Sequence, residues 1–178
     1  MSRRLIPAIA ATVFALSACT SQVGGQATPS ATGSSTAASP TDTFASLSPC
    51  KILDQALAGQ GFPAATPTVA DAKESCRSSK TTVGSTPGMD VGVSLQPGRN
   101  YQDNVTNPSQ ASTGTVHDRP AIEEREPQHS PGQCAVRLDV KPNSRALVLV
   151  SSSADTDTAC KAVEGLAEKV EPLLPKNS

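Results

Sequence analysis

The sequence predicts an α+β fold: a small antiparallel sheet with N- and C-terminal helices packed on it and two disulfides. Three observations lead to this prediction. Segments that alternate apolar and polar residues occur in pairs joined by turn residues, which is typical of antiparallel hairpins. One helical pattern precedes these segments and another follows them. Four cysteines are spread over the same region. The expected order is a helix, two strands, a short helix, three strands and a last helix.

A first helix is predicted over about 49–58. Ser48 stands at the N-cap and Pro49 at the first helical position, and Leu47 is placed to pack against Ile52. Gly59 and Gly61 follow the apolar face of this helix, and glycines in these positions end helices.

Two segments then form a predicted hairpin. The first covers 76–82, and the second covers 89–96, where Met89, Val91, Val93 and Leu95 alternate with polar residues. A short polar helix is expected within 99–107. A third strand is expected over 121–126, and the prolines on both of its sides, Pro120 and Pro127, favour an edge position.

The clearest hairpin signal joins residues 134–140 to 146–150 through Pro142 and Asn143. Because the second of these segments is apolar on both faces, we expect it at the centre of the sheet with both sides covered. A final amphipathic helix follows, capped by Asp155 or Asp157 and ended by Pro172 and Pro175. Its apolar face is built from Ala159, Cys160, Val163, Leu166, Ala167 and Val170.

The first 18 residues have the composition of an export signal. Arg3 and Arg4 precede twelve mostly apolar residues, too few to span a membrane as a stable helix but suited to a signal peptide. The segment Leu16-Ser17-Ala18-Cys19 resembles the lipobox of bacterial lipoproteins, in which the cysteine after the cleavage site takes a diacylglycerol. We therefore expect cleavage before Cys19, a lipid on its sulfur, and export by the Sec or the twin-arginine route.

Residues 19–46 are predicted to be a disordered tether. They are mostly Ser, Thr, Ala, Gly and Pro, with almost no charge and no apolar periodicity. Such a chain reaches roughly 30 Å on average, enough to clear the lipid headgroups. The folded domain is then expected over 47–175.

The four remaining cysteines are interpreted as two disulfides, because an exported domain leaves the reducing cytosol. Three connectivities are open. We favour Cys50 with Cys76 and Cys134 with Cys160, since each pair would join a helix to a strand and Cys134 and Cys160 both face the predicted core. The alternative is a redox pair or a metal site, but no Cys-x-x-Cys occurs.

The sequence offers little that points to catalysis. The two histidines, His117 and His129, lie in loop-like surroundings, and no phosphate-binding loop, serine-hydrolase elbow or zinc-protease pattern appears. The acidic cluster Glu123, Glu124 and Glu126 is interpreted as the solvated side of an edge strand, because nothing apolar around it would raise a pKa. We therefore predict no catalytic residue, no cofactor and no metal.

The net charge of the chain gives no reason to expect nucleic-acid binding. The formal net charge is −1, and removing Arg3 and Arg4 from the 15 basic residues leaves 13 against 16 acidic ones. Aromatic residues make up only 2% of the chain, with no tryptophan. The core must therefore be built from Val, Leu, Ile and Ala, and so thin a core gains much from disulfides.

Seven short segments carry a family resemblance: Ser48-Pro49-Cys50-Lys51-Ile52-Leu53, Ser75-Cys76-Arg77, Asp118-Arg119-Pro120-Ala121, Gly132-Gln133-Cys134-Ala135-Val136, Ala159-Cys160, Leu166-Ala167 and Leu173-Leu174-Pro175. Together they resemble the actinobacterial lipoproteins grouped as domain of unknown function 3558, over about 47–175. The family commonly has Asp before the Pro-Cys and Trp after the Cys-Arg, where this chain has Ser48 and Ser78. The resemblance implies a cell-envelope lipoprotein of high-GC Gram-positive bacteria. It supports the lipid anchor and two structural disulfides, and it transfers no catalytic residue.

These observations predict a non-catalytic binding or interaction module, anchored by lipid to the outer face of the cytoplasmic membrane. Its partner is expected to be an envelope component or a small ligand that binds on the sheet or in a groove beside it. Two alternatives stay open: an envelope enzyme, such as a hydrolase, with an unrecognised site, and a structural or regulatory accessory of an envelope sensor or secretion system.

Overall fold

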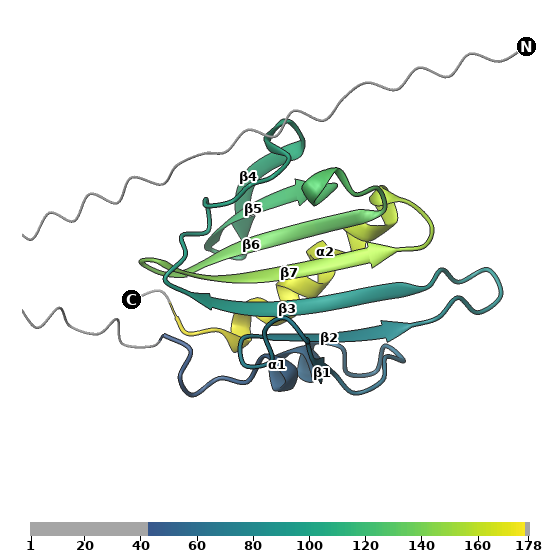
Figure 1. The fold of residues 1–178 in the computed structure, drawn as a ribbon, viewed down its shortest axis with the longest axis horizontal. Coiled ribbons are helices and arrows are strands. Elements are labelled where there is room, and N and C mark those ends of the chain that lie inside the picture. The colour runs from purple at the N-terminus through teal and green to yellow at the C-terminus, as the bar shows by residue number, and fades with distance from the viewer. Residues whose placement is uncertain (1–42, 177–178) are drawn as a thin grey trace, which may run out of the picture. The chain divides into compact units, whose positions relative to one another are not determined.

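The computed structural model describes residues 43–176, and these form a seven-stranded antiparallel sheet with two helices. The helices are α1 (Pro49–Ala56) and α2 (Thr156–Val170). The strands are β1 (Thr66–Pro67), β2 (Ser75–Lys80), β3 (Met89–Pro97), β4 (Ala111–Val116), β5 (Arg119–Arg125), β6 (Gln133–Lys141) and β7 (Ser144–Ser152). The order of the strands across the sheet is β1-β2-β3-β7-β6-β5-β4, so the hairpin β2–β3 and the meander β4–β5–β6–β7 meet at the β3–β7 pair (Figure 1).

Both helices lie on one face of the sheet. α1 packs on β2 and β3, and α2 packs on β6 and β7. Ser48 accepts a hydrogen bond from the Lys51 amide at the start of α1, and Asp155 accepts one of 2.7 Å from the Thr158 amide at the start of α2. These caps supply acceptors that the first turn of a helix lacks. Figure 1 looks onto the opposite face, with α2 behind β6 and β7.

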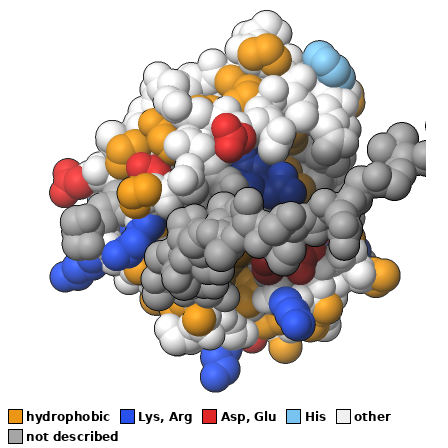
Figure 2. All heavy atoms as spheres, turned by 60° about the vertical axis from the view of Figure 1, so that its left-hand side comes forward, with side chains coloured by type: hydrophobic (Ala, Val, Ile, Leu, Met, Phe, Trp, Pro, Cys, Tyr) orange, Lys and Arg blue, Asp and Glu red, His pale blue; other side chains and the backbone are white. Residues whose placement is uncertain are grey.

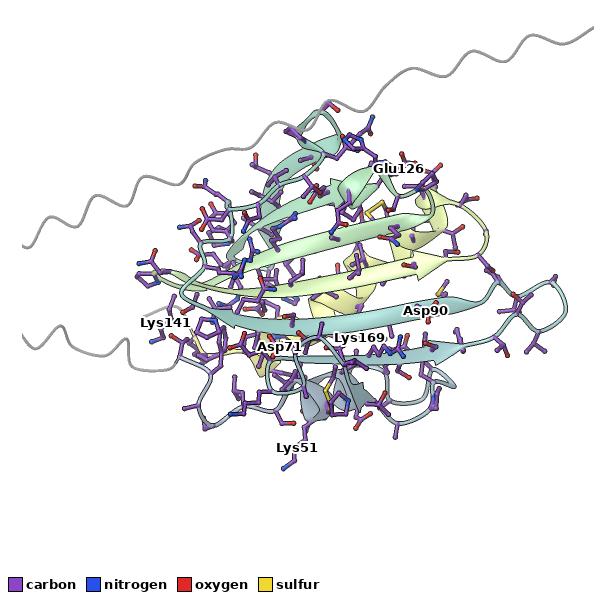
Figure 3. All side chains as sticks on the ribbon, in the orientation of Figure 1. Lys51, Asp71, Asp90, Glu126, Lys141 and Lys169 are labelled. Atoms are coloured by element: carbon purple, nitrogen blue, oxygen red, sulfur yellow. A yellow bond between two sulfur atoms is a disulfide. The ribbon has the colours of Figure 1, made fainter. Side chains whose placement is uncertain are left out.

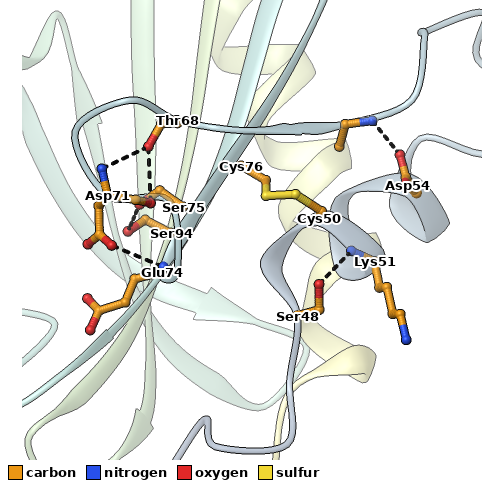
Figure 4. Close-up of a disulfide and its surroundings, with 11 residues drawn as sticks. Ser48, Cys50, Lys51, Asp54, Thr68, Asp71, Glu74, Ser75, Cys76 and Ser94 are labelled. Carbon is orange, nitrogen blue, oxygen red and sulfur yellow. Dashed lines mark hydrogen bonds between the residues drawn. A yellow bond between two sulfur atoms is a disulfide. The ribbon is translucent and has the colours of Figure 1, made fainter.

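Two disulfides tie the helices to the sheet. Cys50 of α1 joins Cys76 of β2, and Cys134 of β6 joins Cys160 of α2. These are the pairs that the sequence analysis favours. Figure 4 shows the first of them, between the helix and the strand beneath it. Each closes a loop with a separation of 26 residues, for which the loop-entropy model gives about 3.5 kcal/mol.

The core lies between the helices and the sheet, and aliphatic side chains dominate it. Phe44 also belongs to it, only 6% exposed, although this residue falls within the predicted tether. The predicted signal peptide, Cys19 and the rest of the tether lie outside the described residues. Within 43–176, no helix is both long enough and apolar enough to cross a membrane.

The sheet is larger than predicted. β1 and β4 are additional strands, and neither shows a sequence pattern: β1 has two residues, and β4 reads Ala-Ser-Thr-Gly-Thr-Val with its four central residues exposed. The helices are also not the ends of the chain, because a turn at 43–46 precedes α1 and a short 3-10 helix, Glu171–Leu173, follows α2.

Three local predictions are wrong. No helix forms within 99–107, where the chain makes turns before a 3-10 helix at Pro108–Gln110. β5 is not an edge strand, because β4 covers it; Pro120 is tolerated since the β5–β6 ladder begins only at Ala121. β7 is central, as predicted, but its outer face is not fully covered, since Leu147 and Leu149 stay partly exposed.

Candidate functional site

The two histidines lie at opposite ends of β5. His117 stands in the β4–β5 turn, where its Nδ1 lies 3.2 Å from a carboxylate oxygen of Glu171, and its side chain is 57% exposed. His129 is exposed in the short 3-10 helix that follows β5. A strand of seven residues separates them by roughly 20 Å. The structure therefore does not assemble the histidines into one site.

Strand alternation separates the acidic cluster, which the sequence analysis interpreted as one solvated surface. Glu123 points to the helix face, and burial together with the neighbouring Glu164 raises the pKa of its carboxyl group. Glu124 points to the other face and is 0% exposed. Glu126 follows the strand and accepts a hydrogen bond of 2.8 Å from the Thr156 hydroxyl group. The interpretation as a solvated edge is thus wrong for Glu124.

Arg119, in a segment that the family resemblance rests on, has a structural position. Its side chain is 4% exposed and donates to the Glu171 carboxylate at 3.0 Å, and to the backbone carbonyls of Asp139 and Pro175 at 2.8 and 2.9 Å. These bonds hold the end of the described chain against β6.

A groove of about 540 Å³ lies on the sheet face opposite the helices, over β2, β3 and β7. Its floor includes the apolar side chains of Leu147 and Leu149 and the bare backbone of Gly92, which pairs with Leu149 across the β3–β7 ladder. This volume lies within the range of small-molecule sites. The groove thus has the dimensions and the apolar lining of a ligand site.

The loop that follows β1 forms one wall of this groove. The Thr68 hydroxyl group donates to the Asp71 carbonyl at 3.2 Å, and a carboxylate oxygen of Asp71 accepts from the Glu74 amide at 3.1 Å (Figure 4). These bonds fix a turn that returns the chain to β2. Asp71 therefore stands near one end of the groove and Asp90 of β3 near the other (Figure 3).

The polar groups of the groove differ in how far they are already paired. Ser75 donates to Ser94 at 2.7 Å, and Asp90 accepts a short hydrogen bond from Ser79. Arg77 is exposed on the groove side of β2, and among the described residues its side chain makes no hydrogen bond or ion pair. The positive charge of Arg77 is therefore available to a ligand, whereas the nearby carboxylates are engaged.

The neighbouring half of the same face is closed by residues 98–110, which run from the end of β3 to β4 (Figure 1). Glu124 accepts hydrogen bonds from the Thr106 and Asn107 amides at 2.7 and 2.6 Å, and it pairs with Arg137 beneath them. Burial alone would raise the pKa of Glu124, but these partners outweigh it and hold the pKa below its usual value.

Arg145 fixes the start of this segment. Its Nε donates to Gln96 at 2.7 Å, and its Nη1 donates to the carbonyls of Asn100 and Asp103. Burial, followed by the charges of Arg137 and Arg99, lowers the pKa of Arg145. Figure 2 shows basic, acidic and hydrophobic side chains interspersed on the face that it draws, with no extended patch of one charge among the described residues there.

A family model described as "Protein of unknown function (DUF3558)" matches residues 14–173. The chain belongs to this family. The DUF3558 match includes Cys19, the four disulfide cysteines and every strand of the sheet. No curated protein matches the chain. No solved structure matches it either. Membership in DUF3558 assigns no activity to the chain.

Proposed function

We propose that this DUF3558 protein is a non-catalytic binding module of the cell envelope. Its groove over β2, β3 and β7, which we call the open-face groove, binds a small amphiphile with an apolar body and an anionic head. The observation that carries the proposal is an apolar floor at Leu147, Leu149 and Gly92 beside the guanidinium of Arg77, which has no partner within residues 43–176. The apolar body covers the floor and loses contact with water. The head group pairs with Arg77.

The test uses the chain from Thr20 onward, which omits only the leader and the cysteine predicted to carry lipid. Anilinonaphthalene sulfonate is titrated into it, and dodecanoate is used to displace the dye. We expect one saturable site for which the two compounds compete, with dodecylammonium displacing the dye at least tenfold less well. Absence of saturable binding by both anions contradicts the proposed ligand chemistry.

Gly92→Leu should abolish this binding while the fold persists. A Cβ at Gly92 meets its nearest neighbour, the Cys76 carbonyl, at an ordinary 3.5 Å, so the new side chain is accommodated and occupies the groove. The matched control is Gly114→Leu in β4, another strand glycine with nothing within 4 Å of its Cβ position. Equal loss of dye binding in both variants would mean that the dye does not use the groove.

Localisation to the cell envelope is part of the proposal. It is supported by the Leu16-Ser17-Ala18-Cys19 segment, which lies within the family match, and by two disulfides, which persist in oxidising compartments. We expect Cys19→Ser to move the expressed full chain from the detergent phase to the aqueous phase or to leave an uncut precursor. Unchanged partitioning of a processed Cys19→Ser chain would contradict the lipid anchor.

The absence of catalysis is also a proposal, and it has its own test. The purified chain is assayed against a panel of hydrolase substrates, and no turnover is expected. Turnover that disappears with His117→Ala or His129→Ala would instead favour an enzyme.

A further inference from the structure

A second surface lies at the far edge of the sheet and is independent of the open-face groove. β4 is the last strand, paired with β5 over six consecutive residue pairs without a bulge. Edge strands in natural proteins are usually guarded by charged side chains, proline or bulges. β4 has none of these, and residues 112–115 are exposed. No strand of the described part of the chain pairs with its outer backbone groups, which can therefore accept another strand.

A groove of about 300 Å³ runs beside this edge on the helix face. The groove lies beside the region where α2 packs most extensively, which is on β6 and β7. Ala121 and Glu123 lie on its floor, and Glu164 and Glu168 of α2 form the opposite wall. On the β4 side Gly114 has no side chain, and nothing lies within 4 Å of the position that its Cβ would take. Long side chains can therefore enter the groove across β4.

The charge of this groove selects among the strands that β4 could accept. Glu123, Glu164 and Glu168 place three carboxyl groups along it, and burial with the proximity of Glu164 already raises the pKa of Glu123. The nearest basic residue of β5, Arg125, is paired with Asp157, and His117, which also lines the groove, lies against the Glu171 carboxylate. Added positive charge would relieve the repulsion between the carboxylates, whereas added negative charge would increase it.

We propose that the free edge of β4 pairs with an extended segment of a partner protein that carries lysine or arginine at every second position, with these side chains lying in the groove between β4 and α2. Successive side chains of a strand point to opposite faces, so every second one reaches the carboxylates. The backbone bonds supply affinity and the groove supplies selectivity, as in other cases of strand addition. A second copy is disfavoured, because antiparallel β4–β4 pairing would place both sets of carboxylates on one face beside the seam.

Binding is measured by calorimetry with the chain from Thr20 onward and an eight-residue peptide that alternates lysine and valine. We expect saturable binding that weakens as salt is added, because the charges involved are solvent-accessible. A peptide that alternates glutamate and valine, and the lysine peptide with a central proline, should each bind at least tenfold more weakly. Equal binding of the glutamate peptide would overturn the charge argument, and equal binding of the proline peptide would overturn strand pairing.

Variants then locate the site. Gly114→Leu fills the space beside β4 and should weaken lysine-peptide binding at least tenfold, and Gly92→Leu on the other face should not change it. Glu164→Gln and Glu168→Gln, both at exposed positions of α2, should together give a similar loss without affecting the fold.

If the lysine peptide binds all these variants equally, the proposed site is wrong. Dimers in sedimentation that dissociate with Gly114→Leu would show that a second copy is the occupant instead. None of these outcomes bears on the dye titration, which tests the open-face groove separately.

Discussion

The sheet face opposite the helices has two halves that meet at β7, and the two halves differ in what covers them. Over β5, β6 and the start of β7, residues 98–110 cover the face, held by Glu124, Arg137 and Arg145. Over β2, β3 and the rest of β7 no such cover is present among the described residues, and the apolar floor with Leu147 and Leu149 is partly open. We call these the covered half and the bare half.

The difference shows how the requirements of stability and binding are separated on one surface. In the covered half, charged groups are buried, and each must be matched because an unpaired buried charge is costly. In the bare half, apolar groups face water without a partner, which contributes little to folding but leaves a surface that a ligand can desolvate. Substitutions in the covered half should therefore change stability, and substitutions in the bare half should change binding.

The largest effect is expected for Glu124→Ala in the covered half. The substitution leaves Arg137 buried without its counter-charge and removes the acceptor of the Thr106 and Asn107 amides. We expect the free energy of unfolding to fall by about 3–5 kcal/mol, measured by urea denaturation. Glu123→Ala is the control, since that neighbour lies on the other face and is only half-buried. Equal losses for the two variants would mean that the covered half is not held by Glu124.

The sequence predicts well where local chemistry decides the structure. Ser48 and Pro49 mark the start of α1, and the alternating residues of 134–140 and 146–150 pair as expected. Cys134 and Cys160 both sit on apolar faces, so their pairing could be favoured from periodicity alone.

The rest depends on contacts between residues far apart in the chain. Glu123 and Glu124 look alike in sequence, yet Glu124 is buried because residues 106–107, 17–18 positions earlier, fold over it. Likewise, residues 146–150 are apolar on both faces of the strand, which indicates a central position in the sheet. Whether the outer face of this strand is covered depends on how far residues 98–110 extend. Leu147 and Leu149 are the sequence signal for the groove, although their pattern alone predicts a covered face.

A smaller effect is expected from acid, and it should affect the covered half first. The pKa of Glu124 is lower in the folded protein than in the unfolded chain. As the pH falls, the Glu124 carboxylate is therefore protonated in the unfolded chain first, and this lowers the stability of the folded protein. The stability that Glu124 contributes is complete above its ordinary pKa of about 4.3 and is lost as the pH falls through the lower folded value. We expect the amide signals of Thr106 and Asn107 to shift in this range by NMR, and Glu124→Gln should remove this part of the acid dependence.

Glu123 should behave in the opposite way. Its pKa is raised in the folded protein, so its ionisation above the folded pKa costs stability. Glu123→Gln should therefore make the folded protein more stable at neutral pH than the parent chain. A destabilised Glu123→Gln variant, or one whose acid limb changes in the way expected for Glu124→Gln, would contradict this assignment of opposite signs.

The smallest effect is expected for Leu149→Ala in the bare half. Its side chain is already partly exposed, so truncation should cost less than about 1 kcal/mol of unfolding free energy while weakening dye binding in the groove. The comparison residue is Ile122, on the same face but in the covered half and only 5% exposed, for which truncation to alanine should cost about 2–4 kcal/mol. Similar losses from urea denaturation for Leu149→Ala and Ile122→Ala would show that the bare half is packed as tightly as the covered one, and the groove would then not be open to a ligand.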